Sequence, residues 1–113
     1  MKKLLVSVIS LIFLFTIVSC SDEENPKFRI FNEGTTKANI QVQTSGGNTI
    51  NINDVEPGEK TAYQSAAEGN IIVKVVIQNA TISPTITFFA AKDIRYTIII
   101  LAGTIPSLRV EHD

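Results

Sequence analysis

The chain has 113 residues, a single Cys, no Trp and a formal net charge of −1 at pH 7. A chain of this length forms one small domain, and one Cys excludes an intrachain disulfide, so the fold must rest on its hydrophobic core. Its basic residues form no stripe, which excludes binding of nucleic acid through neutralised phosphates.

Residues 1–19 have the composition of a targeting segment rather than of a folded element. Lys2 and Lys3 precede an apolar run from Leu4 to Val18. This run is about 15 residues long, whereas a helix that spans a membrane needs about 20. The segment is therefore interpreted as a cleaved signal peptide.

The end of this segment, Ile17, Val18, Ser19 and Cys20, resembles the lipobox of bacterial lipoproteins. The resemblance implies that Cys20 becomes the first mature residue and carries a thioether-linked diacylglycerol and an amide-linked acyl chain. Each buried methylene contributes about 0.8 kcal/mol, so three acyl chains would hold the mature chain firmly on a membrane. An ordinary secretory leader with an incidental Cys and a membrane-spanning helix are the alternatives.

Residues 20–26 are predicted to be a short acidic tether that contains Ser21, Asp22, Glu23 and Glu24. One interpretation is a solvated spacer, because consecutive carboxylates repel each other. The run also resembles the acidic surface-export signal of Bacteroidota lipoproteins, which implies an outer-membrane lipoprotein at the cell surface. A position that faces the periplasm is the alternative.

Residues 27–113 predict an all-β domain, because short runs alternate between polar and apolar side chains or are rich in β-branched residues. The strands are expected at 27–31, 38–43, 49–55, 60–65, 71–77, 85–90, 95–101 and 107–111. The run at 71–77 is apolar on nearly both faces, which is typical of a central strand. Turns are expected at Ser45–Asn48 and Glu56–Glu59, where Gly and Pro provide the required backbone geometry.

Seven to eight short strands with regular turns predict a single antiparallel, Ig-like β-sandwich over residues 27–113. An open barrel is the alternative architecture. The segments Phe28–Asn32, Val55–Gly58 and Arg95–Ile100 with Gly103 resemble, in the same order, motifs of domain of unknown function 4397. That resemblance implies an Ig-like module of bacterial envelope proteins without established catalytic residues. The loop at Asn32–Gly34 departs from the proline-rich loop of that family.

The sequence offers few candidates for chemistry. His112 is the only His and lies next to the last residue, where a frayed tail is expected. One His and a lipidated Cys cannot supply a tetrahedral zinc site, so no metal and no cofactor is predicted. Asn53, Asp54, Glu56 and Glu59 surround a turn and could offer oxygen ligands to calcium, but they lack EF-hand spacing and fit a solvated loop better.

Two further features could support recognition of a partner. The triplet Asn79, Ala80 and Thr81 matches an N-glycosylation sequon, which we interpret as a coincidence in a bacterial envelope protein. Tyr63 or one of Phe88 and Phe89 could stack on a sugar, since adjacent strand residues point to opposite faces; packing against a loop is the alternative.

These observations predict a membrane-anchored lipoprotein that is not an enzyme and acts as a binding or adhesion module, with a protein or a glycan as its partner. A periplasm-facing accessory subunit of an outer-membrane complex is the alternative. An exposed apolar patch would favour a protein partner, and a groove lined by Tyr63 or Phe89 would favour a sugar.

Overall fold

A computed structural model of the protein describes residues 23–113. Within this range the chain is all-β, as the sequence predicted, and its strands alternate between buried and more exposed side chains. The strands are β1 (Lys27–Asn32), β2 (Ala38–Gln43), β3 (Thr49–Val55), β4 (Gln64–Ser65), β5 (Gly69–Ile77), β6 (Thr85–Ala90), β7 (Arg95–Leu101) and β8 (Ser107–His112).

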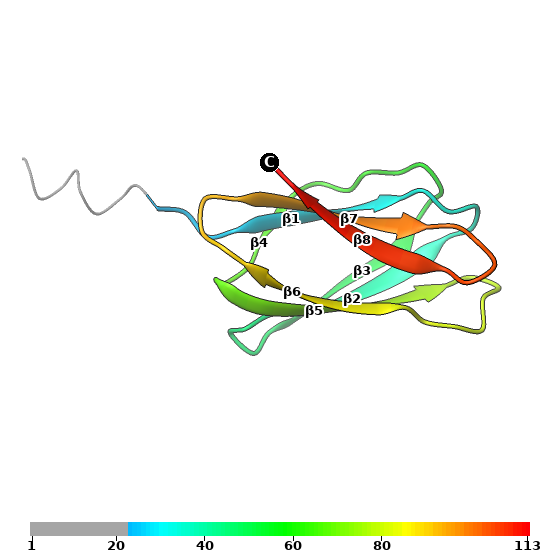
Figure 1. The fold of residues 1–113 in the computed structure, drawn as a ribbon, viewed down its shortest axis with the longest axis horizontal. Helices are drawn as coiled ribbons and strands as arrows, with labels where there is room; N and C mark the ends of the chain where they lie inside the picture. Colours follow the sequence, from blue (N-terminus) through cyan, green and yellow to red (C-terminus); the bar gives the residue numbers. More distant parts are fainter. Residues whose placement is uncertain (1–22) are drawn as a thin grey trace, which may run out of the picture.

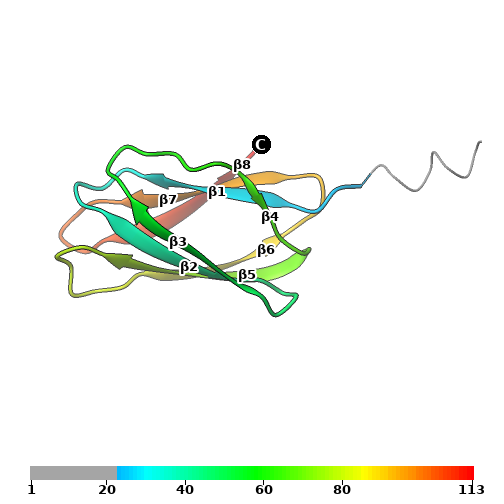
Figure 2. The same ribbon diagram turned by 180° about the vertical axis from the view of Figure 1, so that it is seen from behind.

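The strands form two four-stranded sheets that pack face to face (Figures 1 and 2). Sheet A has the order β4-β1-β7-β8, and sheet B has the order β3-β2-β5-β6. The architecture is therefore the predicted sandwich rather than the alternative barrel. It is Ig-like in its layers, but β1 pairs with β4 and β7, whereas the first strand of a constant-type Ig domain pairs with the second.

One pairing departs from the antiparallel pattern that the sequence predicted. β1 runs parallel to β7 over the whole strand, from Lys27 opposite Arg95 to Asn32 opposite Ile100. The two strands are far apart in the sequence, and the chain crosses to sheet B between them. The alternation of side chains along one strand cannot predict this pairing, because a parallel and an antiparallel neighbour both leave the same alternation of faces.

The strand expected at 60–65 is shorter in the structure, where β4 holds only Gln64 and Ser65. Thr61 interrupts the ladder next to β1. Its amide donates to the Ile30 carbonyl at 2.9 Å, and its hydroxyl accepts a hydrogen bond from the Ile30 amide at 3.0 Å. The Thr61 hydroxyl has thus taken the place of a backbone carbonyl as the acceptor for the Ile30 amide. Side-chain hydrogen bonds of this kind compete with regular strand pairing.

β5 lies between β2 and β6 and is the central strand that its apolar sequence predicted. Its burial is one-sided, however. Ile71, Val73 and Val75 face the core and are buried, whereas Ile72 and Val76 are 41% and 51% exposed on the outer face. The outer face of an antiparallel sheet is free to contact solvent, so the apolar run marked the strand correctly but overstated its burial.

The core lies between the two sheets. Its fully buried side chains contribute most of the stabilisation, about 1.5–3 kcal/mol for each Val, Ile or Phe. The largest of them are Phe28, Ile30, Ile40, Val42, Val55, Ile71, Val73, Val75, Ile98 and Ile100.

The last residues of the predicted tether are held against the domain, although the side chains of Glu23 and Glu24 remain exposed to solvent. The Glu24 amide donates to Asp93 Oδ1 at 2.8 Å, and the Asp93 amide donates to the Glu24 carbonyl at 2.9 Å. Glu23 forms an ion pair with Lys92 at 3.6 Å, and Pro26 is buried. The chain therefore enters the sandwich at a defined place beside the β6–β7 turn, which we call the tether end.

Candidate functional site

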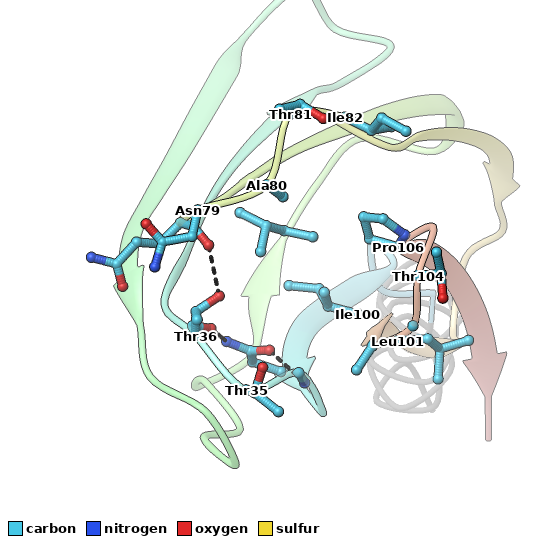
Figure 3. A pocket seen from close by; sticks show the side chains of 16 residues that line it. Thr35, Thr36, Asn79, Ala80, Thr81, Ile82, Ile100, Leu101, Thr104 and Pro106 are labelled. Atoms are coloured by element: carbon cyan, nitrogen blue, oxygen red, sulfur yellow. Dashed lines mark hydrogen bonds between the residues drawn. The ribbon is translucent and has the colours of Figure 1, made fainter.

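A hollow lined by uncharged residues lies at the end of the sandwich opposite the tether end. Three loops form it, β1–β2 (33–37), β5–β6 (78–84) and β7–β8 (102–106), and it has a volume of about 390 Å³. Figure 3 shows Thr36 and Asn79 on one side and Thr104 and Pro106 on the other, with Ile100 between them. We call this feature the distal hollow.

Asn32 at the end of β1 shapes one wall of the distal hollow. Its side chain is 1% exposed, and its Nδ2 donates to the carbonyls of Thr36 at 2.9 Å and Val55 at 3.0 Å. Its Oδ1 accepts a hydrogen bond from the Gly34 amide at 2.8 Å. Both N–H donors of this buried amide and one lone pair of its oxygen therefore form hydrogen bonds. These bonds hold the β1–β2 loop in place.

The β1–β2 loop is in turn tied to the β5–β6 loop. The Thr36 hydroxyl donates to the Gln78 carbonyl at 3.0 Å, and the Gln78 amide donates to the Lys37 carbonyl at 2.9 Å. Asn79 has a positive φ of 68°, a conformation that Asn tolerates better than most residues. Two of the three loops thus form one connected frame.

The lining of the distal hollow carries no charge. Its 16 residues offer hydroxyl and amide groups together with apolar side chains. Ile82 and Ile105, in two of the same loops, are 46% and 69% exposed. Groups of this kind can bind an uncharged partner by hydrogen bonds and apolar contact, but they offer no side chain that exchanges protons near neutral pH.

The residues considered for calcium form a turn rather than a common site. Glu59 Oε1 accepts a hydrogen bond from the Glu56 amide at 2.9 Å, and Glu56 Oε2 lies 3.9 Å from Lys37 Nζ. The Asp54 amide is bound by Asn39 Oδ1 at 2.7 Å. Across residues 23–113, no three His, Cys, Asp or Glu residues converge on a point where they could bind a metal ion. The other residue of the predicted cluster, Asn53, is exposed.

The candidate aromatic residues lie on opposite sheets. Phe88 points inward against Tyr96, with ring centroids 5.0 Å apart, whereas Phe89 is 58% exposed on the outer side of sheet B. The Tyr63 ring lies beside sheet A, with the Arg29 and Arg95 guanidinium carbons 4.7 and 5.4 Å from its centroid. Alternation had predicted that one Phe leaves the core, and Phe89 does so. Tyr63 lines a second hollow of about 500 Å³ at the tether end, where charged side chains such as Lys27, Asp93 and Arg95 surround it.

His112 does not lie in a frayed tail. It is the last residue of β8, where it pairs with Tyr96, and the next amide, of Asp113, donates to the Arg95 carbonyl at 3.1 Å. Its ring contacts the Tyr96 ring edge-on at 6.1 Å. The pairing with β7 orders this end of the chain, and the sequence position alone could not indicate it.

The residues predicted for lipidation and export fall largely outside the described range. These are the lipobox residues Ile17, Val18 and Ser19, the acylated Cys20, and Ser21 and Asp22 of the acidic run. Glu23 and Glu24 are described and lie at the tether end, where Glu24 also forms an ion pair with Lys27 at 3.2 Å.

The sequence analysis missed Asn32 as a structural residue, and its only sequence signal was an Asn at the end of an alternating strand.

Comparison with known proteins does not assign the chain to a family. No protein-family model matches it, and no curated protein matches it. Among residues 23–113 there is no helix of the length and hydropathy that crossing a membrane requires.

Proposed function

We propose that this protein is a bacterial envelope lipoprotein, anchored through acyl chains on Cys20, whose sandwich is a binding or adhesion module without catalytic activity. The leader, the lipobox and the single Cys support the anchor. The motifs shared with domain of unknown function 4397 support an envelope role, and membership of that family is part of the proposal.

The observation that carries the binding role is the position and chemistry of the distal hollow. The chain leaves the sandwich toward Cys20 at the tether end, and only two residues separate Cys20 from Glu23, which already contacts the domain. A chain extends by at most about 3.6 Å per residue, so an anchor on Cys20 would hold the tether end within roughly 10 Å of the membrane. The distal hollow, at the other end, would stay open to solvent.

The lining of the hollow supports an uncharged partner, either a glycan or a protein segment. Hydroxyl and amide groups can bind sugar hydroxyls or peptide groups, and the exposed side chains of Ile82 and Ile105 add apolar contact. All Asp and Glu side chains of residues 23–113 are exposed, so the described domain has no buried carboxylate of the kind that often serves in acid–base catalysis. This distribution of charge supports binding rather than catalysis.

A test of the binding role compares adhesion of cells that display the full chain to immobilised mucin-type glycans and to extracellular matrix proteins. Thr104→Trp would fill the distal hollow from an exposed position. Thr49→Trp, at an exposed position near the tether end, is the matched control. We expect Thr104→Trp to abolish adhesion and Thr49→Trp to retain it; equal adhesion of both variants would contradict a role of the hollow.

The location on the cell is tested separately by protease shaving of intact cells. We propose the outer face of the outer membrane, on the strength of the acidic run after Cys20. Digestion of the wild type, with protection of a variant in which three acidic residues are changed to Ala, is the expected result. Protection of both would favour the alternative, an accessory subunit on the periplasmic side. The three residues are Asp22, Glu23 and Glu24.

A further inference from the structure

The two sheets leave four edge strands, β4 and β8 in sheet A and β3 and β6 in sheet B. An edge strand exposes backbone N–H and C=O groups that can pair with another chain, and monomeric proteins usually protect such edges with charges, bulges or short strands. Three of these edges carry such protection. Within residues 23–113 the fourth, β6, has only the Tyr96 hydroxyl at its last residues as a cover.

The three protected edges use different means. β4 has only two residues. β8 carries Arg109 and Glu111 on its outer face, joined by an ion pair at 3.1 Å. β3 is irregular, because its register with β2 shifts between Ala38 and Ile40 and because Asp54 has a positive φ of 57°.

β6 is regular and uncharged. Its register with β5 continues without a shift from Lys74 opposite Thr85 to Gly69 opposite Ala90. Residues 78–91 contain no charged side chain, and the nearest Pro, Pro84, precedes the strand instead of interrupting it. The strand is thus a continuous template for pairing.

The hydrogen bonds with β5 show which backbone groups of β6 point outward. The Val75 amide donates to the Pro84 carbonyl at 3.0 Å. The backbone N–H and C=O groups of every second residue from Pro84 therefore point toward β5. Thr85, Thr87 and Phe89 therefore direct their N–H and C=O groups away from the sheet. At the last residues of β6 the Tyr96 hydroxyl lies on this side, where it accepts a hydrogen bond from the Ala91 amide at 2.9 Å and lies 3.5 Å from the Phe89 carbonyl. The open part of the edge is therefore centred on Thr85 and Thr87.

The side chains of β6 also remain partly open at this edge. Ile86 and Phe88 point inward but are only half-buried, whereas the residues opposite them in β5, Val73 and Ile71, are fully buried. Phe89 is 58% exposed on the outer face. A further strand beside β6 would cover apolar surface on both faces of the sheet.

We propose that β6 pairs with β6 of a second copy of this chain, in antiparallel orientation about a twofold axis at Thr87. In this register Thr87 would exchange two hydrogen bonds with Thr87 of the second copy, and Thr85 would do so with Phe89 on each side. The two B sheets would join into one continuous sheet of eight strands.

The absence of charge favours a second copy over a different protein. In a twofold pair the same short strand forms both sides of the interface. A charged residue at position 87 would therefore lie opposite an identical charge, and a strand with charges of one sign would repel the same strand of the second copy. A different partner would require only complementary charge. The uncharged run at 78–91 avoids this repulsion, and the pair would place the exposed Phe89 ring beside Thr85 of the second copy.

The pair is compatible with anchoring of both copies in one membrane. The twofold axis is perpendicular to sheet B, so the two tether ends lie at opposite ends of the pair. Both anchors reach the same bilayer when the strands lie along its surface, with sheet A, which contains β1 and receives the tether, on the membrane side. The distal hollows then stay open at the two ends.

The test uses single-Cys additions to the full chain, purified from membranes in detergent and oxidised under air. Paired residues at the axis have Cα atoms about 5.5 Å apart, within the span of a disulfide of about 4.4–6.8 Å. Thr87→Cys is therefore expected to give a covalent species of twice the chain mass. Thr85→Cys is the matched control, because the two positions 85 would lie more than about 13 Å apart.

The results separate the pairing from its alternatives. No dimer with Thr87→Cys, or equal dimer with both variants, would overturn the proposal, and an adduct with a different protein would show that another chain occupies the edge. Thr87→Lys should convert the dimer to monomer in sedimentation, whereas Thr49→Lys on the protected β3 edge should not. Circular dichroism checks that both Lys variants fold. The chain without an added Cys controls for bonds through Cys20.

Discussion

Replacement of Asn32 by Leu tests whether one buried amide determines the shape of the distal hollow. The substitution keeps a side chain of similar size but removes two donors and one acceptor. It leaves the Val55 carbonyl without its partner in the core and the Thr36 carbonyl and Gly34 amide without theirs near the surface. The β1–β2 loop and the end of β3 should therefore loosen together.

The magnitude follows from the burial of the three hydrogen bonds. The bond to Val55 is buried and the other two are partly buried. An unsatisfied buried group costs about 1–3 kcal/mol, and a partly buried bond that water can replace costs about 0.5–1.5 kcal/mol. We expect Asn32→Leu to lower the free energy of unfolding by about 3 kcal/mol, a large fraction of the roughly 5–15 kcal/mol of a typical domain.

Urea unfolding of the chain without its leader, followed by circular dichroism, measures this loss. With a slope of about 1–1.5 kcal/mol per M, the midpoint should fall by about 2 M or more. Thr36→Val is the control, because it removes only the exposed hydrogen bond to the Gln78 carbonyl and should cost less than about 1 kcal/mol. A loss below 1 kcal/mol for Asn32→Leu, at an unchanged slope, would refute the reasoning.

Three further predictions address the anchor, a close backbone approach and the core. Cys20→Ala should move the protein from carbonate-washed membranes to the soluble fraction, and retention of this variant would rule out lipid anchoring. Gly69→Ala should destabilise the fold by more than about 1 kcal/mol in urea, because φ is +132° and the new Cβ would lie 2.6 Å from Ser45 Cβ. Gly46→Ala, whose new Cβ would lie 3.6 Å from its nearest neighbour, should change stability by less than about 0.5 kcal/mol. Ile98→Ala, at a fully buried position, should cost about 2–5 kcal/mol in thermal or urea unfolding, and a smaller loss would mean that the core collapses around the cavity.

Local chemistry explains why the strands could be located from the sequence. A period of two selects one buried face, and Gly or Pro at turns provides backbone angles that other residues resist. The hairpin at Ser45–Asn48 is an example, since Gly47 adopts a φ of 92° there and its amide donates to the Thr44 carbonyl at 3.0 Å. Patterns of this kind depend only on residues that are neighbours in the chain.

Contacts between distant residues explain what the sequence did not indicate. Thr61 shortened β4 because its hydroxyl met the Ile30 amide, and His112 was ordered because β8 paired with β7. Similarly, alternation placed the two Phe residues on opposite faces of β6, but only the packing of sheet A against sheet B decided that Phe88 faces the core and Phe89 the outside. In each case a partner far along the chain decided the outcome.

The sequence by itself determined the all-β class, the approximate bounds of the strands and the expectation of a lipid anchor, because each of these depends on short-range periodicity or on a contiguous motif. Only the tertiary structure decided that β1 pairs with β7 in parallel, that Asn32 joins the β1–β2 loop to the end of β3, that three loops enclose an uncharged hollow, and that β6 is left at an edge. These features arise when segments distant in sequence meet, and the side-chain alternation of a strand is the same whichever neighbour it takes.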